Sequence, residues 1–74
     1  MTYEEKQLVV RAAQAYMSEK GISQNELAKL AGVNASYLSS ILKGVFTFVN
    51  NRTNEESPIA DKYFQLLAGR IGVN

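Results

Sequence analysis

Residues 24–44 read QNELAKLAGVNASYLSSILKG, and this stretch carries the clearest structural pattern in the chain. Its apolar residues recur at helical spacing on both sides of the central glycine. Ala28 is small where a first helix would face a second one. Gly32 falls where the chain must turn out of the first helix, a position that often needs a positive φ, which glycine adopts without a Cβ clash. The stretch therefore predicts two short amphipathic helices that cross through a tight turn.

Capping residues predict the same helix boundaries. Ser23 and Glu26 have the spacing of a capping box, in which a hydroxyl and a carboxylate satisfy free amides at a helix start. Asn34 can cap the second helix, and Gly44 can end it in the left-handed conformation. The short distance between the two helix starts favours a helix-turn-helix over free-standing bundle helices. The shared apolar face is predicted to comprise Leu27, Ala31, Val33, Leu38 and Ile41.

At these positions the segment resembles the helix-turn-helix of the Cro/repressor-like (XRE) family. Gln24 opens the first helix, Ala28 and Gly32 occupy the small-residue sites, and GVNASYLSSILKG matches the second-helix pattern. The resemblance implies an all-α fold of four to five short helices, a lambda-repressor-like bundle. Residues 1–74 would form a single domain with the motif at residues 23–44. The resemblance also implies double-stranded DNA as the partner, with the second motif helix in the major groove.

Length and composition exclude several classes of protein. The 74 residues form at most one domain with a small core. Without cysteine or histidine the chain has no disulfide, no thiolate metal site and no imidazole base, so we expect no cofactor. Its apolar runs are far shorter than the roughly 20 residues that span a bilayer, and residues 1–5 are acidic where a signal peptide would be basic. These features predict a cytoplasmic protein with no membrane partner.

The charge balance argues against nucleic-acid binding. Lysine and arginine number 8 and aspartate and glutamate 7, so the formal net charge is only +1. Phosphate neutralisation supplies much of the affinity of a protein for DNA. If the chain binds DNA, folding must therefore arrange its few positive charges on one side.

Apolar periodicity predicts one further helix on each side of the motif. The first runs from about residue 3 to residue 20, begins with Thr2 and Glu5 in a capping box and stops at Gly21. Its apolar stripe is interpreted as core rather than as a partner-binding surface and comprises Leu8, Val9, Ala12, Ala13, Tyr16 and Met17. The last helix is expected to begin with Ser57 as cap and Pro58 at the first helical position. Its predicted inward face comprises Ile59, Tyr63, Leu66, Leu67 and Ile71.

The segment after the motif is β-branched and aromatic over residues 45–49, and a polar loop follows. A short hairpin is one alternative, but no second strand of similar quality follows, so we expect extended coil. Phe46 and Phe48 either complete the core or form an adhesive patch. The Tyr37 hydroxyl could bind a phosphate, although packing of its ring against Tyr16 or Phe46 is favoured.

Helical geometry sends one face of residues 35–43 outward, because Leu38, Ile41 and Leu42 point inward. In the resembled family these outward positions often carry long side chains that reach bases, whereas here they are small. Serine can donate or accept and so discriminates poorly between bases, which predicts close docking with modest sequence specificity. The predicted groove-facing residues are Ala35, Ser36, Ser39, Ser40 and Lys43.

Other candidate contacts are to the phosphate backbone. Gln24 and the backbone N–H groups at its helix terminus could hold a phosphate oxygen, or Gln24 is an ordinary exposed residue. Lys29 and Lys43 are candidate phosphate ligands or solvated surface charges. Arg52, in the polar loop, is a weaker candidate.

The leading hypothesis is a double-stranded DNA-binding module from a transcriptional regulator or a mobile-element protein. A homodimer on paired half-sites would compensate for its small interface. The order of motif, aromatic segment, polar loop and IADKYFQLLAGRIG also resembles, more loosely, the N-terminal domain of Mu B-like phage transposition ATPases. No catalytic constellation can be assembled, so the sequence favours neither an enzyme nor a small-molecule substrate. The alternative is a helical protein-interaction or targeting module that does not bind DNA.

Overall fold

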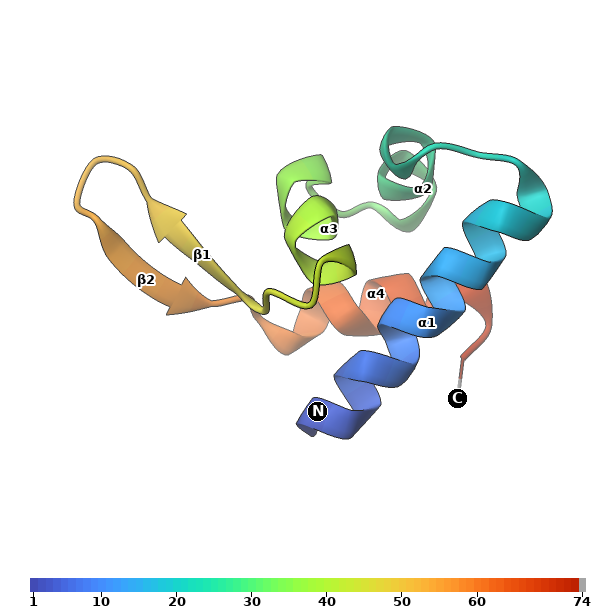
Figure 1. Ribbon diagram of the computed structural model, residues 1–74, viewed down its shortest axis with the longest axis horizontal. Helices are drawn as coiled ribbons and strands as arrows, with labels where there is room; N and C mark the ends of the chain where they lie inside the picture. Colours follow the sequence, from blue (N-terminus) through green and yellow to red (C-terminus); the bar gives the residue numbers. More distant parts are fainter. Residues whose placement is uncertain (74) are drawn as a thin grey trace.

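The computed structural model describes residues 1–73, so Asn74, the last residue of the predicted domain, lies outside it. The described residues form four helices around one core and a two-stranded antiparallel sheet that projects from it (Figure 1). The helices are α1 (Tyr3–Lys20), α2 (Gln24–Ala31), α3 (Ala35–Leu42) and α4 (Asp61–Ile71), and the strands are β1 (Thr47–Asn50) and β2 (Glu55–Pro58). The predicted helix-turn-helix bundle is present, but the predicted all-α class is not exact, because β1 and β2 form a small sheet.

The first helix has the predicted bounds and the predicted caps. The Thr2 hydroxyl accepts a hydrogen bond from the Glu5 backbone N–H at 3.1 Å, and the Glu5 carboxylate accepts one from the Thr2 N–H at 2.9 Å. Gly21 ends the helix in the left-handed conformation, with φ +66°. The stripe on α1 supplies Val9 and Ala13 to the core, whereas Leu8 was wrongly placed there and is 55% exposed.

The segment after the motif forms a β-hairpin, so the expectation of extended coil was wrong. Phe48 pairs with Ser57, and Asn50 pairs with Glu55. Every residue of β2 is exposed. A strand that faces solvent on both sides carries no alternation of apolar and polar residues, which is why the sequence pattern did not reveal it.

The last helix begins three residues later than predicted, because Pro58 still belongs to β2. Ile59 is buried, and its N–H donates to the Phe46 carbonyl at 2.8 Å, which continues the pairing of the two segments. Ala60 is the N-cap and makes no side-chain capping bond, so the assignment of Ser57 as cap was wrong.

The buried face of α4 is largely the predicted one, with one residue misassigned and one missed. Leu66 was predicted to face inward but is 46% exposed, and Phe64, which was not on the predicted inward face, is fully buried. The other predicted positions were correct, because Ile59 and Leu67 are buried and Tyr63 and Ile71 pack partly against the core. The core that results is formed by Val9, Ala13, Leu27, Ala28, Ala31, Val33, Leu38, Ile41, Ile59, Phe64, Leu67 and Ala68.

Candidate nucleic-acid interface

The turn between α2 and α3 is built as the sequence indicated. Gly32 has φ +73°, and the Val33 N–H reaches back to the Ala28 carbonyl at 3.0 Å, which satisfies a free carbonyl at the end of α2. Ala28 and Val33 are both buried. Because Ala28 is small and Val33 fills the space below the turn, α3 is held close against α2.

Capping side chains begin both motif helices. The Ser23 hydroxyl accepts from the Glu26 N–H at 3.2 Å, and the Asn34 side chain accepts from the Ser36 N–H at 2.8 Å. The capping box predicted at Ser23 is half formed: the bond from the Glu26 N–H to the Ser23 hydroxyl is present, and the reciprocal bond to the Glu26 carboxylate is not among the hydrogen bonds of residues 1–73. At the other end of α3, Gly44 is left-handed with φ +79°, as predicted. Both helices are therefore stabilised locally as well as by their packing.

The outward face of α3 is largely accessible. Leu38 and Ile41 have no exposed surface, which fixes the opposite face toward solvent. Ala35, Ser36 and Lys43 are exposed, whereas Ser39 and Ser40 are half-buried. The helix packs mainly on α2, α1 and β1. The exposed residues therefore lie on the first turn of α3 and at Lys43, directly after the helix, and the residues between them are less exposed.

Tyr37 packs rather than standing free. The centre of its ring lies 4.9 Å from the centre of the Phe48 ring and 4.9 Å from the centre of the Tyr63 ring. The prediction of packing is confirmed, but the expected partners, Tyr16 and Phe46, were wrong. Tyr37 thus joins α3 to the hairpin and to α4.

The two phenylalanines of the hairpin base complete the core instead of forming an adhesive patch. Phe46 lies edge-on to Phe64 at 5.3 Å and to Tyr3 at 5.6 Å, and Phe48 lies against Tyr37. Both side chains are partly buried against the core. The exposed aromatic cluster that would favour a protein-interaction module is not found at these two residues.

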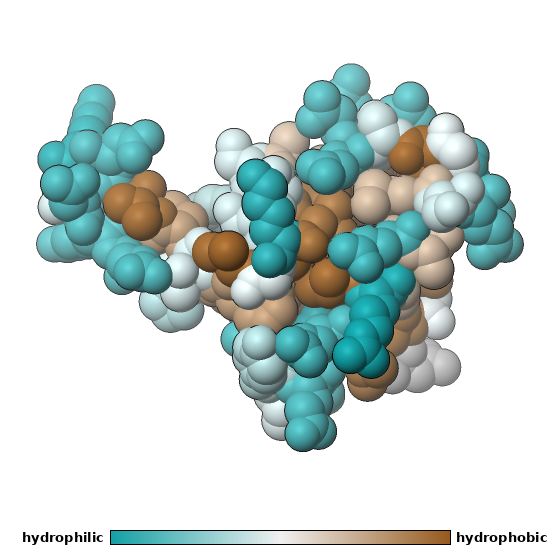
Figure 2. Space-filling view, viewed as in Figure 1, coloured by the Kyte–Doolittle hydropathy of each residue, from teal (hydrophilic) through white to brown (hydrophobic). Residues whose placement is uncertain are grey.

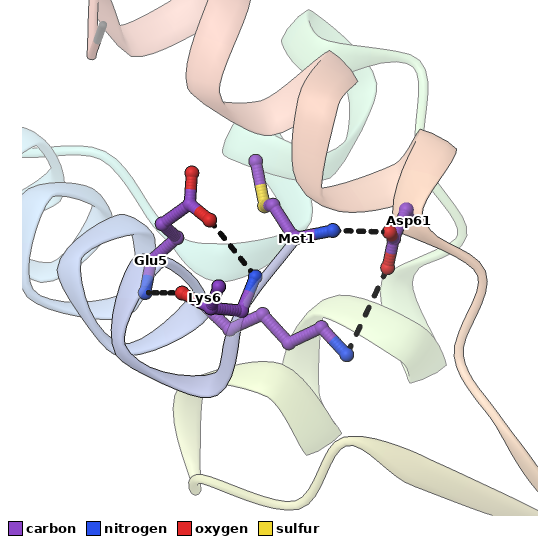
Figure 3. Close-up of polar contacts among 5 residues, drawn as sticks. Met1, Glu5, Lys6 and Asp61 are labelled. Carbon is purple, nitrogen blue, oxygen red and sulfur yellow. Dashed lines mark hydrogen bonds and ion pairs between the residues drawn. The ribbon is translucent and has the colours of Figure 1, made fainter.

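The remaining candidate contacts are displayed on the surface. Gln24, the first residue of α2, is exposed, and so are Lys29 near the end of α2 and Lys43 after α3. In contrast, Lys6 is directed inward: its Nζ lies 3.7 Å from an Asp61 carboxylate oxygen and 5.2 Å from the Phe64 ring centre (Figure 3). The ion pairs within residues 1–73 involve Lys6 and the N-terminus, and neither Lys29 nor Lys43.

Other kinds of site find little support in the described part of the chain. The hollow between α1 and the α3–β1 turn has a volume of about 120 Å³ and is open to solvent, well below the roughly 300 Å³ at which ligand pockets begin. Residues 1–73 contain no cluster of three potential metal-ligating side chains. None of the helices in this range is long and apolar enough to cross a membrane.

Comparison with known families assigns the same region. Residues 14–47 match a family model described as "Helix-turn-helix", a DNA-binding family. The match begins in the second half of α1, covers α2, the turn and α3, and ends at the first residue of β1. No curated protein and no solved structure matches the chain.

Proposed function

We propose, from the premise that residues 14–47 are a helix-turn-helix of the XRE family, that this protein binds double-stranded DNA with α3 in the major groove. The observation that carries this proposal is the exposed start of α3. Ala35 and Ser36 stand clear of the core on a helix whose other face is anchored by Leu38 and Ile41. A helix with such small outward residues can approach the floor of a groove closely.

The proposed interface combines weak base reading with phosphate contacts. Ser36, Ser39 and Ser40 would face the bases, and serine accepts or donates without strong preference. Gln24, Lys29 and Lys43 would contact phosphates on either side of the groove, while Tyr37 would mainly position α3. Modest sequence specificity is the expected result.

The proposal extends to the role of the whole domain and to its oligomeric state. Residues 1–73 would act as one DNA-binding domain in a transcriptional regulator or a mobile-element protein, and a homodimer on paired half-sites would raise the affinity. The looser likeness to Mu B-like transposition ATPases stays a prediction. The expected compartment is the cytoplasm, and no enzymatic role is proposed.

The variant Ser36→Glu tests the proposal directly. Ser36 is the second residue of α3, where a carboxylate interacts favourably with the helix dipole, so the free energy of unfolding should stay the same or rise by about 0.3–1 kcal/mol. The same carboxylate would face DNA phosphates, and we expect binding of a labelled mixed-sequence duplex to be abolished in fluorescence anisotropy.

Gln65→Glu is the matched control, because it adds the same charge to an exposed position of α4. It should leave DNA binding near that of the unmodified protein. A homodimer that contributes Lys29 and Lys43 from each protomer would make about four cationic contacts, so log K against log salt should slope by about −3.6. Normal binding by Ser36→Glu would show that α3 is not the DNA-binding surface, and a flat salt response would contradict the phosphate contacts altogether.

A further inference from the structure

We infer that the hairpin turn, residues 51–54, is a second DNA-contacting element that binds the sugar-phosphate backbone beside the groove occupied by α3. This inference rests on the proposed function and adds to it a surface outside the matched residues 14–47. The outward face of α3 carries a single cation, Lys43, so an interface limited to α3 would neutralise little phosphate charge.

The hairpin packs on α3 at its base, and this contact sets its position relative to a bound duplex. The Phe48 ring of β1 packs on the Tyr37 ring of α3 at 4.9 Å. The base of the hairpin is closed by the hydrogen bond from the Ile59 N–H to the Phe46 carbonyl, and Ile59 is buried in the core. A helix docked in a groove would therefore carry the hairpin with it.

The hairpin also extends far enough to reach a neighbouring phosphate strand. Figure 1 shows it projecting past the helices on the side of α3. Strands of four residues span about 13 Å, which is close to the roughly 12 Å width of the major groove. Figure 2 shows that its far end is covered by hydrophilic residues, unlike the apolar base.

The turn is held in one shape by its own hydrogen bonds. The Asn50 side chain accepts from the Arg52 N–H at 3.0 Å, and the Asn50 carbonyl accepts from the Asn54 N–H at 2.7 Å. Asn54 is left-handed with φ +56°, and the Thr53 hydroxyl accepts from the Glu55 N–H. A fixed turn that presents one guanidinium loses less conformational entropy on binding a phosphate than a mobile loop would.

The two glutamates of β2 lie on opposite faces of the hairpin. Side chains alternate along a strand and paired residues share a face, so Glu55 lies on the same face as Phe48, toward α3. Glu56 lies on the other face, where its carboxylate accepts a hydrogen bond from the Thr47 hydroxyl at 2.7 Å. If DNA lies beside α3 and the turn, Glu55 faces it and Glu56 does not.

Three single substitutions test this arrangement by anisotropy with a labelled mixed-sequence duplex. Arg52→Gln should weaken binding by about three- to tenfold and reduce the salt slope by about one, equally on unrelated sequences. Glu55→Gln should tighten binding by a similar factor, because it removes a negative charge near phosphate. Glu56→Gln, which retains a partner for Thr47, should change affinity less than about twofold.

The outcomes separate this inference from the proposed function. If the unmodified protein binds DNA, Ser36→Glu abolishes binding, and Arg52→Gln and Glu55→Gln leave it unchanged, the hairpin contact is wrong while the role of α3 stands. An equal effect of Glu55→Gln and Glu56→Gln would also contradict it, since only general charge would then matter. Absence of DNA binding by the unmodified protein would overturn both.

Discussion

At the scale of single residues, Gly32 is required for its backbone conformation and not for lack of space. Its φ is +73°, and a Cβ built on it would meet no atom within 4 Å. Gly69 is the useful contrast, because it also has open space around its Cβ position but lies within α4 in a helical conformation without positive φ. Because both positions have open space, the two glycines differ in whether the backbone requires a positive φ.

We therefore expect alanine to have opposite effects at these two glycines. Gly32→Ala should lower the free energy of unfolding by about 1–2 kcal/mol, because L-residues are strained in the left-handed region. Gly69→Ala should raise it by about 0.5–1 kcal/mol, because alanine favours the helix. Chemical denaturation monitored by circular dichroism measures both changes, and a stabilising Gly32→Ala would contradict the assigned turn.

At the scale of elements, the hairpin depends on one aromatic contact for its attachment to α3. Phe48 is the β1 residue that packs on Tyr37, and its neighbour Val49 points to the opposite face and is 51% exposed. A two-stranded hairpin alone is marginally stable in water. The contact between Phe48 and Tyr37 should therefore decide how firmly the hairpin is held.

Removal of the Phe48 ring should loosen the hairpin while the helices persist. Phe48→Ala should cost about 1–2 kcal/mol of unfolding free energy, less than for a fully buried ring, since Phe48 is half-buried. Amide hydrogen exchange of β1 and β2 should accelerate more than that of α2 and α3. Val49→Ala is the matched control and should change the free energy of unfolding by less than about 0.5 kcal/mol. Equal losses in the two variants would contradict the assignment of Phe48, and not Val49, to the face that packs on Tyr37.

At the scale of the whole molecule, ion pairs join the starts of α1 and α4 (Figure 3). The N-terminal ammonium of Met1 donates to the Asp61 carboxylate and lowers the pKa of Asp61 below its usual value, with Lys6 adding to the effect. The hydrogen bond from the Thr2 backbone N–H likewise lowers the pKa of Glu5. The contacts of Asp61 with Met1 and Lys6 hold together elements that are distant in sequence.

Acid should therefore weaken the fold through these carboxylates. Both pKa values are lower in the folded chain, so the stabilisation is present above the unfolded pKa and is lost as the pH falls through the folded value. Asp61→Asn should lower the melting temperature at neutral pH and flatten its decline below about pH 5. The melting curves of the two proteins should converge at the lowest pH, and a constant difference at all pH values would contradict the ion-pair assignment.

Local signals in the sequence determined the motif. Thr2, Ser23 and Asn34 begin helices, and Gly21 and Gly32 end them, because capping bonds and positive φ involve only residues close along the chain. The same locality explains why the inward positions of α3 were predicted correctly. Which of the predicted contacts bind DNA stays a prediction.

Tertiary structure alone decided the rest. The hairpin, the start of α4 at Asp61 and the burial of Phe64 depend on Ile59 reaching the core and pairing with Phe46, a contact between segments that no local pattern records. The partners of Tyr37 were equally non-local. Caps and periodicity act over a few residues, whereas the choice between strand and helix near Pro58 was made by long-range burial and hydrogen bonding.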